Sequence, residues 1–208
     1  MADVNDMFND ITKEQSYYKA GAKKEITQFA KGEYLGHITK VDSKVVDVQN
    51  KYKARVYTYT VEVANENKDM DFTVIDIDGK PKSLKGDAYI GKKFLGKLWR
   101  FLEPTDKDTF ESNSTGNTNY LRFCESIGVK CPKETKTIGG EDIEVQILPS
   151  LSDDDFLGQP VTAVVDLGKP WTDREGKRRQ YWECKFCKKW ANGKKKTISG
   201  GKSNEIPF

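Results

Sequence analysis

The chain has 208 residues and a mass of 23.6 kDa, which suits one domain of ordinary size with additional segments. Hydrophobic residues make up 36% and charged residues 32%, and no run approaches the roughly 18 apolar residues of a membrane span. The first residues, MADVND, lack the basic start and apolar run of a signal peptide. We therefore expect a soluble, cytoplasmic protein whose four cysteines are reduced thiols or metal ligands.

Charge is distributed unevenly along the chain. The formal net charge is only +3, but residues 169–202 contain twelve Lys and Arg against Asp173, Glu175 and Glu183. Aromatic residues make up 11%, a large share for so polar a chain. Such rings fill a thin β-core or lie on the surface, and composition leaves both uses open.

The N-terminal half predicts an arm followed by three strands. Residues 1–30 have no sustained apolar stripe and are predicted to form the arm. Apolar and polar residues alternate over 32–41 and again over 55–63, which predicts two antiparallel strands. A turn at 78–81 comes before a third predicted strand at 92–102.

The C-terminal half predicts a helix followed by two strands. Apolar residues recur at helical spacing over 120–127 until Gly128 ends the pattern. Ser152 and the three aspartates after it predict a capped helical turn. Residues 161–167 and 180–186 predict a hairpin with a polar loop between its strands.

Five strands with one helix between the third and the fourth is the order of an OB-fold barrel. The predicted fold class is therefore mainly β, with one or two short helices, while an SH3-like barrel or a small sandwich remains an alternative. The predicted domain spans residues 31–190. Residues 191–208 are rich in Gly, Lys and Ser and are predicted to form a disordered, flexible tail.

Residues for catalysis are scarce in this sequence. The single histidine, His37, lies in an alternating strand, where a structural or solvent-facing role is favoured. There is no Gly-rich phosphate loop, nucleophile elbow or zinc-protease helix. We therefore expect a protein that is not an enzyme and holds no cofactor.

The cysteines raise one alternative, a zinc-dependent interaction module. Cys184 and Cys187 have the two-residue gap of a zinc knuckle, and Cys124 and Cys131 would complete four ligands. Positions three apart in a regular strand, however, point to opposite faces of the sheet. The residues between Cys184 and Cys187 are also not a turn sequence, so we expect no metal site.

Basic residues alternate with aromatic residues on the second, third and last predicted strands. They also do so in the loop that joins the last two strands. This mixture suits a single-stranded nucleic acid, since bases stack on rings at about 1–3 kcal/mol each while Lys and Arg follow the phosphates. By alternation, Trp182, Phe186 and Trp190 are expected in the core. The candidate DNA-binding residues are Arg55, Tyr57, Tyr59, Lys97, Trp99, Phe101, Trp171, Arg174, Arg178, Arg179, Tyr181, Lys185 and Lys189.

The chain ends in SNEIPF, with Ile206, Pro207 and Phe208 after the Gly-rich stretch. A basic, aromatic OB-fold with such an ending resembles the single-stranded DNA-binding proteins of bacteria and their phages. The runs 32–63 and 158–161 look like the phage-encoded members, which extends the resemblance over most of residues 30–190. In that family the C-terminal Phe docks into pockets on replication and repair proteins.

The resemblance implies a viral protein that coats single-stranded DNA during replication, recombination and repair in the host cytoplasm. It also implies that Ile206, Pro207 and Phe208 bind partner proteins. Bacterial members carry several aspartates before the tripeptide, whereas this chain has only Glu205 there. Attraction to a basic partner pocket should therefore be weaker. An RNA-binding OB protein is the alternative within this class, although the sequence has no feature that indicates recognition of a ribose 2′-hydroxyl.

Overall fold

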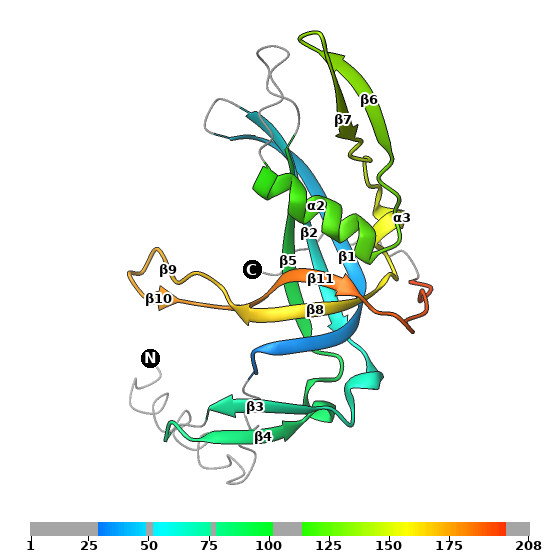
Figure 1. Ribbon diagram of the computed structural model, residues 1–208. Helices are drawn as coiled ribbons and strands as arrows, with labels where there is room; N and C mark the ends of the chain where they lie inside the picture. The colour runs from blue at the N-terminus through cyan, green and yellow to red at the C-terminus, as the bar shows by residue number, and fades with distance from the viewer. Residues whose placement is uncertain (1–28, 49–51, 76–77, 102–113, 199–208) are drawn as a thin grey trace, which may run out of the picture.

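The computed structural model describes residues 29–48, 52–75, 78–101 and 114–198. Five strands close a barrel in the order β1-β2-β5-β11-β8 (Figure 1). Only the pairing of β5 with β11 is parallel, and the helix α2 lies in sequence between the third and fourth barrel strands. This is the five-stranded Greek-key barrel of the OB-fold, so the predicted fold class is confirmed. The barrel strands are β1 (Gly32–Val48), β2 (Tyr52–Val63), β5 (Lys93–Phe101), β8 (Pro160–Leu167) and β11 (Trp182–Lys189).

Short elements fill the connections between the barrel strands. Figure 1 shows that three two-stranded hairpins, β3–β4, β6–β7 and β9–β10, extend from the barrel in different directions. None of the described helices is long and apolar enough to cross a membrane. The connecting elements are η1 (Asn65–Asn67), β3 (Asp71–Ile75), β4 (Pro81–Lys85), η2 (Gly86–Tyr89), α2 (Ser114–Ser126), β6 (Lys133–Ile138), β7 (Glu141–Gln146), α3 (Asp153–Phe156), β9 (Trp171–Thr172) and β10 (Arg178–Arg179).

Aromatic rings are the largest fully buried side chains of the hydrophobic core. The ring of Tyr34 stacks on that of Phe72, with centroids 4.4 Å apart and planes 11° from parallel. At the opposite end of the core, Phe156 packs against Tyr57 and Phe123, with centroids 5.1 and 5.0 Å apart. A chain with few aliphatic residues thus uses large rings to fill its core, and the core explains much of the aromatic content.

Alternation along β2 and β5 determines which residues face outward. Trp99 lies opposite Val56 and Phe101 lies opposite Ala54 in the antiparallel ladder. Val56 and Ala54 are buried although alternation places them on the outer face. We infer that the two rings of β5 cover these small side chains, so the outer face of the barrel is apolar here.

The described elements confirm the five strands and both helices predicted from sequence, with shifted ends. The hairpins β3–β4 and β6–β7 were not predicted. A signal for the second one was present, because Gly139 and Gly140 have φ values of 62° and 91° and form the two-residue turn that a Gly-Gly pair between strands indicates.

Described residues on both sides of the predicted domain, 31–190, contact the barrel. Phe29, assigned to the arm, packs its ring against Phe94 with centroids 5.3 Å apart. Residues 191–198, assigned to the tail, lie against the barrel: Lys196 N donates to Gly158 O over 2.9 Å, and His37 Nε2 lies 3.0 Å from Lys194 O. The remaining tail, 199–208, and the arm, 1–28, lie outside the described residues.

We expect Gly96→Ala to destabilise the barrel by about 1–3 kcal/mol in urea or thermal denaturation. An added Cβ at this strand position would lie 2.4 Å from Cζ of the buried Tyr59 ring, which cannot move without disturbing the core. Gly32→Ala in β1 is the matched control, because its Cβ would meet Phe72 at an ordinary 3.5 Å. Equal stability of the two variants would contradict this packing of Tyr59 on Gly96.

Candidate nucleic-acid interface

A groove opens on the barrel where β5 and β11 separate. The two strands pair only through Leu95 with Glu183 and Gly96 with Cys184. Beyond these pairs α2 packs against both strands. The space between the three elements has a volume of about 460 Å³, within the roughly 300–1,000 Å³ typical of ligand pockets. We call it the β5–β11 groove.

A β-bulge shapes the β11 wall of the groove. Cys184 lies opposite Val165 and Phe186 lies opposite the very next residue, Val164, so Lys185 is the extra residue of the bulge. Cys184 and Cys187 are consequently both buried, whereas Lys185 and Phe186 are both exposed. The prediction that Phe186 belongs to the core was wrong, because it assumed regular alternation. Phe186 is 46% exposed and lines the groove.

Two rings of β5 form a stacking surface on the opposite wall. The rings of Trp99 and Phe101 have centroids 6.1 Å apart and planes within 19° of parallel. Trp99 is 38% exposed, and Lys97 precedes it on the same outward face. The structure therefore brings five of the predicted residues together around one groove: Tyr59, Lys97, Trp99, Phe101 and Lys185.

All charged side chains that line the groove in the described part of the chain are basic. They are Lys97, Arg122 and Lys185, and Lys185 also pairs with Glu183 over 2.6 Å. Arg122 was not predicted, because the sequence does not tell which gap of the barrel α2 covers. Its place on the helix follows from spacing: it adjoins the buried Phe123 and so lies at the edge of the apolar stripe.

Three of the predicted residues lie on the face of β2 that points into the barrel. Tyr57 and Tyr59 are each 1% exposed, and the Tyr57 hydroxyl donates to Leu151 O over 3.3 Å. Arg55 shares their side of the strand and lies opposite Arg100. The placement of Tyr57 and Tyr59 on the outer surface was wrong, because the aromatic face of β2 is the one that fills the barrel. Arg55 is half-buried. Tyr59, although buried, lines the floor of the groove.

The β9–β10 hairpin carries a second pair of rings. Trp171 is 48% exposed and Tyr181 is 61% exposed, and their centroids lie 6.1 Å apart with planes 40° from parallel. Arg174 and Arg178 are exposed on the same hairpin. The hairpin occupies the loop between the fourth and fifth barrel strands, which is one of the loops that OB-folds use for binding. Lys189, also predicted, is exposed at the end of β11 and does not line the groove.

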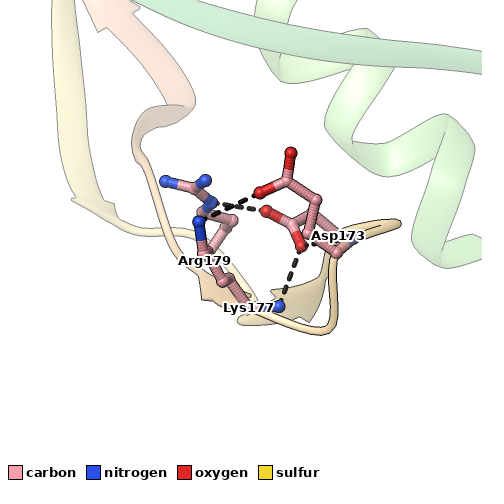
Figure 2. Close-up of polar contacts among 4 residues, drawn as sticks. Asp173, Lys177 and Arg179 are labelled. Carbon is pink, nitrogen blue, oxygen red and sulfur yellow. Dashed lines mark hydrogen bonds and ion pairs between the residues drawn. The ribbon is translucent and has the colours of Figure 1, made fainter.

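Asp173 fixes the turn of this hairpin, as Figure 2 shows. Its Oδ1 accepts the N–H groups of Glu175 and Lys177 over 3.0 and 2.8 Å, and its Oδ2 accepts from Arg179 Nε over 2.8 Å. Arg179, predicted to bind DNA, therefore has one nitrogen engaged in holding the turn. Its two terminal nitrogens point away from Asp173 (Figure 2). The Arg179 hydrogen bond, with help from the two backbone N–H groups, lowers the pKa of Asp173.

The four cysteines do not form the zinc site of the alternative interpretation. Among the described residues, which include all four thiols, no three His, Cys, Asp or Glu side chains are grouped to hold a metal ion. Cys184 and Cys187 lie in the barrel, with Sγ atoms 3.8 Å apart. Cys124 instead lies on α2, where burial and its neighbour Cys131 raise its pKa to about 12.

Comparison of the chain with protein-family models, with curated proteins and with solved structures gives no match.

We expect the Asp173 carboxyl to titrate below its ordinary pKa of about 3.9 in an NMR titration of the folded protein. The hydrogen bonds to the carboxylate then stabilise the turn above that pH, and this contribution is lost as pH falls through the lowered pKa. Arg179→Gln should move the pKa upward. Lys177→Gln is the control, because the Lys177 side chain pairs with Glu175 instead. An unchanged pKa in Arg179→Gln would contradict the assigned contact.

Proposed function

We propose that this protein binds single-stranded DNA in the β5–β11 groove and acts by binding alone, without catalysis. The observation that carries the proposal is a pair of nearly parallel rings, the exposed Trp99 and the half-buried Phe101. They line a groove whose charged lining residues, in the described part of the chain, are all basic. Rings with exposed faces accept bases of any sequence, and cations beside them contact the phosphates. Binding should therefore depend little on sequence and strongly on salt.

Several features favour a single strand over a duplex. Bases in a duplex are stacked on one another and paired, so their faces are not available to Trp99, Phe101 or Phe186. The groove is also bounded by α2, which supplies Arg122 to the lining. A surface for duplex DNA would need basic residues but no exposed rings.

The proposed path of the DNA runs from the groove to the β9–β10 hairpin. Tyr181, which precedes β11, is four residues from Lys185 in the bulge, about 13 Å along an extended chain. The hairpin pair of Trp171 and Tyr181 then serves as a second stacking site, with Arg174 and Arg178 beside it. The groove and the hairpin together make a longer contact than either does alone.

The biological setting of this binding rests on the resemblance and not on the site. We propose that the protein coats and protects single-stranded DNA during replication, recombination and repair, as a phage protein would in its host. Recruitment of partners through Ile206, Pro207 and Phe208 is part of the same proposal, and these residues lie outside the described part of the chain.

We expect Trp99→Ala to weaken binding of labelled oligo-dT by about 1–3 kcal/mol in fluorescence anisotropy, because one base loses the ring on which it stacks. Phe186→Ala should have a similar effect, since that ring faces the groove from β11. Trp99→Phe should retain part of the affinity.

The matched control is Ile143→Ala, which removes another exposed apolar side chain from the β6–β7 hairpin. Thermal denaturation of each variant separates lost binding from lost folding, because Trp99 also lies opposite the buried Val56 in the β2–β5 ladder. Unchanged dT affinity in folded Trp99→Ala and Phe186→Ala proteins would contradict the groove as the binding site.

A further inference from the structure

Two thiols lie directly beneath the proposed DNA-binding surface. The Sγ atoms of Cys184 and Cys187 are 3.8 Å apart, and the Tyr59 hydroxyl lies 3.8 Å from the first and 3.5 Å from the second. Both cysteines are almost fully buried, and Cys187 lines the floor of the groove. The residues between them, Lys185 and Phe186, both face the groove. The thiol pair and the groove wall thus belong to the same four-residue stretch.

The backbone geometry permits a bond between these thiols. Because of the bulge, Cys184 and Cys187 lie opposite Val165 and Ala163, which are two positions apart on β8. Two strand positions correspond to a Cα separation of about 6.6 Å, at the upper end of the roughly 4.4–6.8 Å range found in disulfides. Without the bulge, the two side chains would point to opposite faces and no bond could form.

We propose that Cys184 and Cys187 are a reversible modification site, at which a peroxide forms a disulfide that reshapes the β5–β11 groove. One thiolate attacks an oxygen of the peroxide and becomes a sulfenic acid, releasing hydroxide or alkoxide. The second thiol attacks that sulfur, forms the S–S bond and releases water. The two sulfurs lose two electrons in total, and with hydrogen peroxide the reaction gives two molecules of water.

The two cysteine pairs of the chain differ in how easily they form the thiolate that attacks the peroxide. Hydrogen bonding from Cys187 lowers the pKa of Cys184 and raises that of Cys187, so Cys184 supplies the first thiolate. Burial raises the pKa of both Cys124 and Cys131, which disfavours the thiolate form in that pair. Oxidation should therefore select the pair beneath the groove.

The effect on DNA rests on the proposed function. Formation of the S–S bond draws the ends of the bulge together. This changes how the side chains of Lys185 and Phe186 contact bound DNA. We expect oxidation to weaken oligo-dT binding by about 5-fold or more, the lower end of typical coupling between two sites. Reduction with dithiothreitol should restore the affinity.

The test treats the full chain with hydrogen peroxide, maps its peptides by mass spectrometry and measures oligo-dT binding by anisotropy before and after reduction. A disulfide joining residues 184 and 187, with a reversible loss of affinity, is the expected result. Cys187→Ser and Cys187→Ala should resist both changes. Cys124→Ser is the control that should undergo both.

Absence of the disulfide in the peptide map would overturn the proposed site, whatever the DNA affinity. A disulfide with unchanged dT affinity would overturn the link to the groove. If the reduced protein binds no DNA, the proposed function fails instead, and the peptide map still decides whether the modification site exists.

Discussion

The contact between Tyr59 and Gly96 is the constraint on which the rest of this molecule depends. Gly96 pairs with Tyr59 on one side and with Cys184 on the other, at the place where β5 and β11 close the barrel. Because position 96 has no side chain, the buried Tyr59 ring fits over it and its hydroxyl reaches both thiols. Only two residue pairs join β5 and β11, so the strands separate immediately afterwards. The groove beneath α2 is a direct result of that short closure.

The proposed DNA contact has two parts. The groove is a fixed surface of the barrel, and the β9–β10 hairpin is a surface that projects from it. Trp99 and Phe101 lie opposite the buried Val56 and Ala54 in the antiparallel ladder, so the barrel fixes the backbone that carries the two rings. Trp171 and Tyr181 belong to a hairpin whose turn depends on Asp173. A rigid stacking surface limits the conformational entropy lost on binding, whereas a projecting one extends the contact along the strand. Such a division suits a ligand that is itself flexible.

Much of the barrel could be predicted from sequence, because alternation and helical spacing are local signals that survive in the folded chain. The orientation of single residues could not be predicted where those signals are interrupted. The extra residue of the bulge, Lys185, switches each later side chain of β11 to the opposite face of the sheet. Phe186 is therefore exposed, and Cys184 and Cys187 lie on the same side. On β2 both faces carry apolar or aromatic residues, so the sequence did not reveal that Tyr57 and Tyr59 fill the interior. Arg122 joins the site only through the packing of α2 across the barrel.

The preference of the groove for single-stranded DNA can be tested directly by an anisotropy titration of labelled oligo-dT, with matched duplex DNA and oligo-U alongside. At low salt we expect tight binding to dT, weak binding to the duplex, and quenching of tryptophan fluorescence as bases stack. Raising the salt should lower log K for dT with a slope of about −0.7 for each phosphate contact. Equal affinity for duplex and dT would contradict a stacking groove, because it would mean that basic charge alone binds the nucleic acid. Preference for oligo-U over dT would assign the groove to RNA.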